Sequence, residues 1–258
     1  MDWSRTKTIF IVTFLMLNIF LTWQLIETNN ANKLSMIAEA TTQETLNQYN
    51  ITIDVELPKE DVTGLHIMGK NVPLTDEAIP FLGIQEVASD DDQFIEVVLD
   101  EPFQISQDNF FVQLSTFLST YVFEGEEYRY GHYDELERRI FLYQTFEDKI
   151  AYTLDDEPPL VLQLDDQQQI ISYKQSYFEF EELQGREREI LSSLKAIEVL
   201  LNDQLIGMND TITNVEFGYY SFFSPQGNVQ VFAPMWRVSV DNETFLVNAI
   251  EGAVQQLS

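Results

Sequence analysis

The stretch TIFIVTFLMLNIFLTWQLI, residues 8–26, contains no charged residue and decides how the whole chain is organised. At a rise of 1.5 Å per residue it forms a helix of about 28 Å, close to the roughly 30 Å hydrocarbon thickness of a bilayer. Trp3 and Trp23 lie at its two ends, and Arg5 and Lys7 precede it. Tryptophan favours the membrane interfaces and basic residues stay on the cytoplasmic side. The sequence therefore predicts a transmembrane anchor with a cytoplasmic N-terminus.

A cleaved signal peptide is the alternative interpretation, because it also joins a short basic region to an apolar stretch. The apolar run here is longer than the usual signal-peptide core, and no Ala-x-Ala-like site follows it, since the chain continues as ETNNANK at residues 27–33. We therefore expect an uncleaved anchor. It divides the chain into a cytoplasmic head (residues 1–7), the membrane helix (8–26) and an extracellular part.

The part that follows the anchor is strongly acidic. The chain has 43 Asp and Glu residues against 14 Lys and Arg residues, a formal charge of -29, and almost all of them follow residue 27. This charge repels a phosphate backbone, so the composition excludes a nucleic-acid partner. The absence of cysteine excludes disulfides, thiolate zinc sites and thiol nucleophiles. Because 45% of the residues are hydrophobic, we expect a folded domain with a real core.

The first extracellular half, residues 49–183, follows a polar stretch at 27–48 that predicts a stalk helix or linker. At residues 108–121 apolar side chains recur at helical spacing, and Ser106 or Asp108 is placed to cap this helix. Residues 73–92 are expected to form a loop. Strands are predicted where apolar residues alternate between turn signals. They cover residues 51–57, 65–72, 93–99, 128–133, 138–145, 149–154, 160–164 and 169–180.

The second extracellular half, residues 184–258, repeats this plan. Residues 186–204 predict a helix with an apolar face, formed by Ile190, Leu191, Leu194, Ile197, Leu200, Leu201 and Leu205. Strands are predicted at residues 213–222, 229–232, 235–240 and 244–249. A helix followed by antiparallel strands, twice over, indicates an α+β fold class with two halves, each a helix laid on an antiparallel sheet.

The residues offer little support for catalysis. His66 and His132 lie far apart, each in a predicted strand and without the spacing of a zinc site. No nucleophile elbow, Walker loop or dinucleotide fingerprint is present. We therefore assign no catalytic, metal-binding or cofactor-binding residue. The acidic runs at 90–92, 155–157 and 165–166 lack the order of a calcium loop and are interpreted as turns. Because a glycosidase needs only two carboxylates, a membrane-tethered cell-wall hydrolase with an acidic pair remains an alternative.

Aromatic residues are abundant near two predicted strands. They are Tyr128, Tyr130 and Tyr133, the run YYSFF at residues 219–223, and Trp236. Such residues usually fill a core. An aromatic strand face that docks a peptide or a partner domain by sheet addition is the second interpretation.

Within the membrane helix, Asn18 is the residue that needs an explanation. An amide in hydrocarbon is unfavourable unless it finds a hydrogen-bond partner. Ile11, Leu15, Asn18 and Thr22 share one face of the helix. We therefore predict that this face contacts another transmembrane helix.

The N-terminal residues resemble those of a known family. MDWSRTKTIFI at residues 1–11 and FLMLNIFL at residues 14–21 are similar to the N-terminus of the YycI (WalI) family, and the length and plan of the chain agree. The resemblance implies a non-enzymatic regulator from a low-GC Gram-positive bacterium. Together with a YycH-type sister protein, it would inhibit a WalK-type sensor histidine kinase that controls cell-wall metabolism. It also implies a contact with the kinase through the membrane helix, and an extracellular domain similar to the C-terminal part of YycH.

The C-terminal region resembles a PepSY-type module over a short stretch. The similar residues are Pro234, Trp236 and Val238, followed by Val247, Asn248, Ala249 and Gly252. This similarity implies a binding or inhibitory role, so an extracellular chaperone or protease inhibitor is a further alternative.

Overall fold

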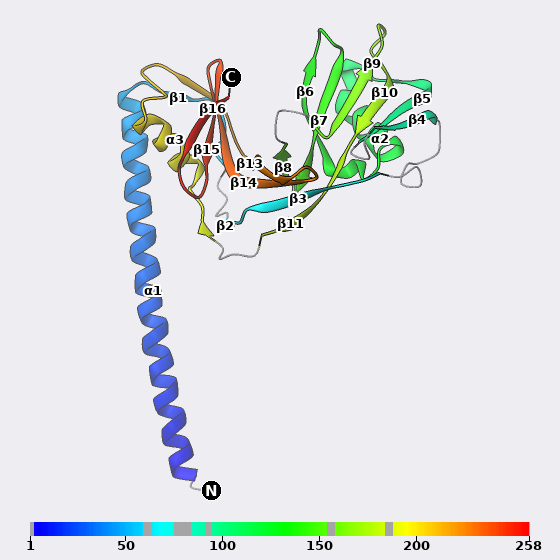
Figure 1. The fold of residues 1–258 in the computed structure, drawn as a ribbon. Helices are drawn as coiled ribbons and strands as arrows, with labels where there is room; N and C mark the ends of the chain where they lie inside the picture. The colour runs from blue at the N-terminus through cyan, green and yellow to red at the C-terminus, as the bar shows by residue number, and fades with distance from the viewer. Residues whose placement is uncertain are drawn as a thin grey trace.

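The computed structural model describes residues 3–58, 63–74, 84–90, 94–153, 158–183 and 188–257. One long helix at the N-terminus runs down the side of a β-rich domain that has two lobes (Figure 1). Of the acidic run at 90–92, residue 90 ends strand β4 (Ile84–Asp90) and residues 91–92 lie outside the described residues, as does the run at 155–157.

The N-terminal helix, α1 (Trp3–Gln48), is continuous over 46 residues. At 1.5 Å per residue it is about 69 Å long, more than twice the hydrocarbon thickness of a bilayer. The apolar segment and the polar stretch at 27–48 therefore belong to one helix, so the stalk forms without a break.

The first lobe is an antiparallel sheet with strand order β6-β7-β9-β10-β5-β4. Helix α2 (Phe110–Tyr121) packs on it through Leu114, Phe117 and Leu118, which share a core with the inward side chains of the strands. The strands are β4 (Ile84–Asp90), β5 (Phe94–Gln104), β6 (Tyr128–Asp134), β7 (Arg139–Phe146), β9 (Leu160–Leu164) and β10 (Gln169–Gln175).

The second lobe is built on the long hairpin of β13 (Thr211–Gln226) and β14 (Val229–Val240). Helix α3 (Ser193–Asn202) covers one face of this sheet with Ala196, Ile197 and Leu200. The strands that pair around the hairpin are β1 (Thr52–Ile53), β3 (Ile67–Val72), β11 (Tyr177–Glu182), β15 (Glu243–Asn248) and β16 (Val254–Leu257). A separate two-stranded piece consists of β2 (Thr63–Gly64) and β12 (Arg188–Glu189).

The two lobes share one continuous strand network. Strand β8 (Lys149–Tyr152) pairs antiparallel with the end of β7 and parallel with β13. The chain also passes from β10 to β11 through the single residue Ser176. The predicted strand over 169–180 is therefore two strands, because its two parts pair in different lobes.

The prediction of two strands at 229–232 and 235–240 is wrong, because they form the single strand β14 around Pro234. Residues 229–232 pair with β3 and residues 235–240 pair with β15. Proline has no N–H to donate, and Pro234 lies at the point where the neighbouring strand changes. The strand continues because Pro234 stays in register with Tyr219 of β13, and its carbonyl oxygen still accepts from the Ala249 N–H at 2.9 Å.

Both predicted helices are shorter than expected. Helix α3 begins at Ser193 instead of residue 186, because the Ser192 hydroxyl accepts a hydrogen bond from the Lys195 N–H and caps it. Helix α2 follows a short 3-10 turn, and neither Ser106 nor Asp108 caps it. Instead the Gln113 side chain reaches back to the backbone N–H of Ser106 at 2.6 Å.

Three strand predictions also need correction. Of residues 51–57, only Thr52–Ile53 pair in a sheet, although Ile51, Val55 and Leu57 do pack against the second core. Strand β4 occupies part of the expected loop, and β16 was not predicted. Strands β4 and β16 lie at the edge of their sheets, and each pairs with only one neighbouring strand. The alternating apolar pattern that predicts a strand is weak in both.

The α+β fold class is confirmed, with one helix on each of two hydrophobic cores. Strands β1, β3 and β11 precede residue 184 in the sequence and pair within the second lobe. The division of the chain at residues 183 and 184 stays a prediction.

Candidate functional site

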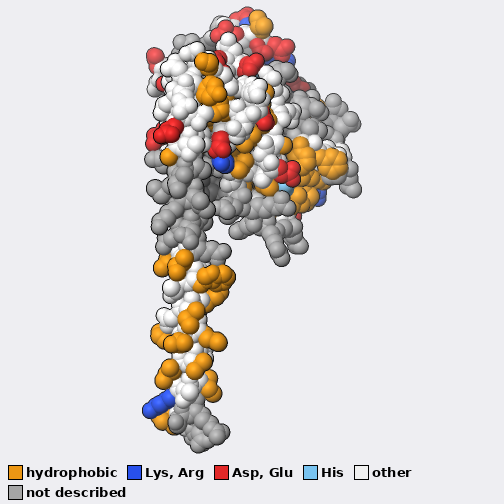
Figure 2. Space-filling model, turned by 90° about the vertical axis from the view of Figure 1, so that its left-hand side faces the viewer, with side chains coloured by type: hydrophobic (Ala, Val, Ile, Leu, Met, Phe, Trp, Pro, Cys, Tyr) orange, Lys and Arg blue, Asp and Glu red, His pale blue; other side chains and the backbone are white. Residues whose placement is uncertain are grey.

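The N-terminal part of α1 is apolar on every side and covered by nothing in the described structure. Lys7–Ile26 has the length and composition of a membrane-spanning helix, and none of it is buried. Figure 2 shows hydrophobic side chains along the lower helix and acidic side chains gathered on the domain above it. Monomeric soluble proteins rarely expose an apolar surface of this size. This segment therefore has the properties of a membrane anchor.

The four residues predicted to form an interaction face lie together on α1. Ile11, Leu15, Asn18 and Thr22 line one shallow groove along the helix, with Phe14 and Trp23 among the side chains that border it. Ile11 is 66% exposed and Leu15 is 58% exposed. The groove is thus available to a partner helix, and its use stays a prediction.

Asn18 satisfies part of its hydrogen-bonding capacity within the helix. Its Nδ2 donates to the Phe14 carbonyl oxygen at 2.7 Å, and the Thr22 hydroxyl donates to the Asn18 carbonyl oxygen at 2.8 Å. In the part of the chain that the structure describes, the Asn18 side-chain oxygen has no donor. A hydrogen-bond donor on a second helix would satisfy this side-chain oxygen.

The predicted membrane-interface anchors lie at the two ends of the apolar segment. Trp3 and Trp23 are exposed and about 30 Å apart along the helix axis. The ammonium of Lys7 lies 5.5 Å from the centre of the Trp3 ring. The side chain of Arg5 lies outside the described part. The spacing matches a hydrocarbon layer, and the anchoring role of the four residues stays a prediction.

The last turns of α1 dock on the second lobe. Leu46 is 1% exposed and belongs to the core beneath α3, and Thr42 is 5% exposed. The Thr42 hydroxyl donates to Glu198 Oε2 at 2.8 Å, and Lys195 donates to the same carboxylate at 2.9 Å. This junction joins the membrane helix directly to the domain. The sequence did not reveal it, because Leu46 stands alone in a polar stretch.

Glu198 carries a depressed pKa at this junction. Burial alone raises the pKa of its carboxyl, but hydrogen bonds from Lys195 and Thr42 and the Lys195 charge lower it below the ordinary value. A group whose pKa is lower in the folded state stabilises the fold above its unfolded pKa. That contribution is lost as the pH falls through the folded pKa.

We predict that Glu198→Gln weakens the junction at neutral pH by about 0.5 to 1.5 kcal/mol, because a partly exposed charged acceptor is lost. The difference from the unaltered protein should shrink as the pH falls below the ordinary glutamate range. Amide hydrogen exchange in residues 42–48 at several pH values measures it. Glu135→Gln, which changes an exposed acid in the β6–β7 turn of the first lobe, is the control. An equal difference at every pH would contradict this prediction.

The histidines and the remaining acidic run do not converge on a site. His66 lies just before β3 instead of inside a strand, and its ring packs on Phe222. His132 lies in β6 against Phe141. Asp165 forms a turn by accepting from the backbone N–H groups of residues 167 and 169. Among the described residues, no group of three or more histidines and carboxylates could hold a metal ion.

Most of the aromatic residues fill the two cores. Tyr128, Tyr219 and Trp236 are 2%, 6% and 1% exposed. Phe222 and Phe223, near the tip of the β13–β14 hairpin, are the exceptions and are more than half exposed. The interpretation of the aromatic residues as core therefore holds for the strand centres and fails at the hairpin tip.

A pocket of about 470 Å³ holds several carboxylates between the end of β7 and β11. Its acidic residues are Glu126, Glu127, Glu147, Asp148 and Glu179. Glu127 accepts hydrogen bonds from Gln144 at 3.0 Å and Tyr177 at 3.1 Å, so it ties β7 to β11. Arg129 pairs with Asp148 at 3.2 Å. The carboxylates of Glu127 and Asp148 thus take part in contacts within the protein.

Comparison with known proteins identifies the family of this chain. The YycI protein family model matches residues 29–250. The chain belongs to the YycI family. The match begins after the membrane helix, so it is independent of the N-terminal residues that resemble the family. No curated protein sequence matches the chain.

Two solved structures resemble this YycI-family chain at low identity. An uncharacterized protein from Eubacterium rectale matches with a TM-score of 0.48 and 11% identity, over 81% of this chain and 91% of that one. YycH from Bacillus subtilis matches with a TM-score of 0.38 and 10% identity, over 78% of this chain and 53% of YycH.

Membership of the YycI family gives the chain a general role. It is an accessory protein of a two-component regulatory system, in a family of regulators rather than enzymes. The apolar segment of α1 is long and apolar enough to cross a membrane, as an anchor would be.

Proposed function

We propose that this protein inhibits a WalK-type sensor histidine kinase, together with a YycH-type partner, through the Ile11, Leu15, Asn18 and Thr22 face of α1. Its N-terminus lies in the cytoplasm and its domain outside the cell. The observation that carries the proposal is that an apolar helix, whose exposed face carries Asn18 and Thr22, continues without a break into a domain of the YycI family.

The energetics limit how such a regulator acts. A partner shifts a two-state kinase only by binding one state more tightly than the other. A polar contact between membrane helices contributes about 1 to 2 kcal/mol at most. Asn18 must therefore act together with the apolar contacts of Ile11 and Leu15 on the same face of α1.

A chimera tests the location of the inhibitory contact. Residues 1–30 are fused to an unrelated extracellular domain and expressed in a strain that lacks the native protein, with a cell-wall metabolism reporter as the readout. Restored repression places the contact in the membrane helix. Loss of repression, with normal insertion and expression, would overturn the assignment to α1 and move the contact to the domain.

Asn18→Leu tests directly whether Asn18 contributes to the contact with the kinase. We expect about a five- to tenfold loss of kinase co-purification from membranes, which corresponds to the loss of one interhelical hydrogen bond. Thr13→Val is the matched control, because Thr13 is also polar, bonds to the Ile9 carbonyl within α1 and does not line the groove. Equal co-purification of the Asn18 variant and the unaltered protein would contradict the proposal.

A further inference from the structure

A cleft of about 780 Å³ lies between the two lobes, away from α1. One wall is the face of the first-lobe sheet opposite α2, with Phe141 on β7 and Lys174 on β10. The other wall comes from the end of β3 and the tip of the β13–β14 hairpin, with Asn71 and Asn228. Its size is in the range of known small-ligand sites, about 300 to 1,000 Å³.

The charge of this cleft differs from that of the rest of the protein. In a chain with 43 acidic and 14 basic residues, the described residues of the cleft include two basic side chains, Arg139 and Lys174, and one acidic side chain, Glu96. An excess of one sign of charge in a cleft favours ligands of the opposite sign. The cleft therefore favours an anionic ligand, although the surface around it is acidic.

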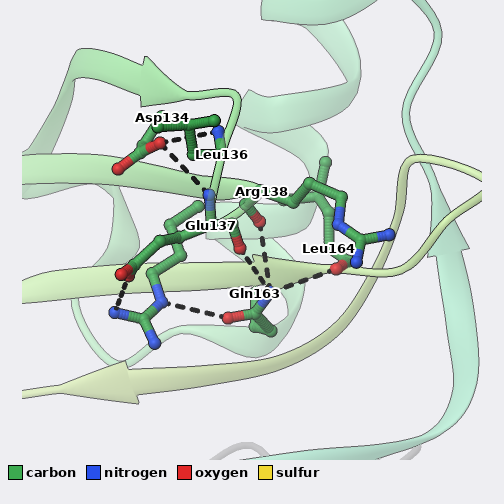
Figure 3. A network of polar contacts seen from close by, with 7 residues as sticks. Asp134, Leu136, Glu137, Arg138, Gln163 and Leu164 are labelled. Carbon is green, nitrogen blue, oxygen red and sulfur yellow. Dashed lines mark hydrogen bonds and ion pairs between the residues drawn. The ribbon is translucent and has the colours of Figure 1, made fainter.

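Glu137 and Gln163 belong to a polar network around the β6–β7 turn (Figure 3), and both hold Arg139 in place. Its Nε donates to Gln163 Oε1 at 3.1 Å, and its Nη1 pairs with Glu137 at 2.6 Å. Gln163 is itself fixed, because its Nε2 donates to the carbonyl oxygens of residues 137, 138 and 164. Within the described residues, the Nη2 group of Arg139 has no acceptor. A fixed guanidinium with a free edge suits a carboxylate.

Lys174 is positioned by an aromatic ring. Its ammonium lies 3.5 Å from the centre of the Phe94 ring, across the β10–β5 pair. Glu96 lies opposite Lys174 in the strand register, yet the ammonium forms no ion pair within 4.0 Å in the described part of the chain. The cation therefore keeps its capacity to pair with an incoming anion.

The other side chains of the cleft fit a polypeptide backbone and apolar side chains. Asn71 and Asn228 carry amides, which offer both donors and acceptors as an extended peptide requires. Phe94 and Phe141, which are partly exposed, offer apolar contact surface. We propose that this cleft binds a short extended peptide that carries carboxylates. The inference does not depend on the proposed kinase inhibition, because it concerns the domain alone.

Direct binding to the full-length protein in nanodiscs tests the inference. The probe is fluorescent acetyl-Leu-Glu-Leu-Glu with a free C-terminal carboxylate, and its neutral counterpart is acetyl-Leu-Gln-Leu-Gln amide. Physiological ionic strength screens repulsion from the acidic surface. We expect saturable binding of the anionic peptide, and binding of the neutral peptide at least tenfold weaker, because two ion pairs are lost.

Three variants locate the binding. Arg139→Gln and Lys174→Gln should each weaken binding about fivefold. Arg138→Gln is the matched control, because Arg138 is the adjacent arginine, is 44% exposed against 45% for Arg139, and pairs with Asp166 away from the cleft. It should bind like the unaltered protein.

Gly227→Trp tests the cleft by shape instead of charge. Gly227 lines the cleft, a Cβ there meets no atom within 4 Å, and its backbone is not in the left-handed region. The indole should block binding and leave the thermal midpoint unchanged. Equal affinity for the two peptides, an Arg138→Gln effect as large as that of Arg139→Gln, undiminished binding by Gly227→Trp, or no binding at millimolar peptide would each overturn the inference.

Discussion

Gln144→Leu is expected to lower the free energy of unfolding of the domain by about 2 to 5 kcal/mol, because it leaves two buried backbone groups without partners. Gln144 lies in β7 and is 1% exposed. Its Oε1 accepts from the Phe178 N–H at 3.0 Å, and its Nε2 donates to the Phe178 carbonyl oxygen at 2.8 Å. The side-chain amide thus takes the place of a neighbouring strand for β11.

The destabilisation caused by Gln144→Leu should be strongest where the two lobes meet. Leucine has nearly the same volume, so the loss comes from the unpaired N–H and C=O of Phe178 instead of a cavity. Urea unfolding followed by circular dichroism measures the free energy, and hydrogen exchange in residues 177–182 locates the change. Gln167→Leu, at an exposed turn position, is the control and should stay within about 0.5 kcal/mol of the unaltered protein. A Gln144→Leu variant as stable as this control would refute the bridging role.

Trp236→Ala is expected to lower the free energy of unfolding by about 3 to 5 kcal/mol, because it removes the largest side chain of the second core. Trp236 is 1% exposed, and its ring packs edge-on against Phe217 at 5.3 Å between ring centres. Its Nε1 donates to the Leu191 carbonyl oxygen at 2.7 Å, just before α3. Loss of the indole should loosen α3, and with it the surface on which α1 docks.

Trp236→Phe separates packing from hydrogen bonding. It keeps an aromatic ring but leaves the Leu191 carbonyl without its donor, so the loss should be intermediate, about 1 to 3 kcal/mol. Phe222→Ala is the control, because Phe222 is 56% exposed and its removal creates no cavity. Urea unfolding measures the three variants. A Trp236→Ala loss no larger than that of Phe222→Ala would contradict the assignment of Trp236 to the core.

The sequence predicted most of the regular structure because local patterns carry the necessary information. The helical spacing of apolar residues located α2 and the body of α3, and β6, β7 and β9 were placed within a residue or two. The errors fall where a distant partner decides the outcome. Pro234 reads as a strand break, yet β14 continues because its neighbour changes at that residue. Ser176 reads as part of one strand, yet it separates the two lobes.

The candidate sites show the same contrast. The face of Ile11, Leu15, Asn18 and Thr22 could be named from the sequence, because residues three and four apart share a helix face wherever the helix lies. Thr42 and Glu198 are 156 positions apart, and no local pattern marks them as a contact.

By itself the sequence determined the apolar segment that is long enough to cross a membrane, the acidic composition of the domain that follows it and the α+β class. These depend on length, charge and periodicity, which need no knowledge of neighbours. Only the tertiary structure decided that α1 is one helix docked on α3, that Gln144 replaces a strand beside β11, and that Arg139 and Lys174 meet in one cleft. Each of these depends on contacts between distant residues, and such contacts form only when the chain has packed into its cores.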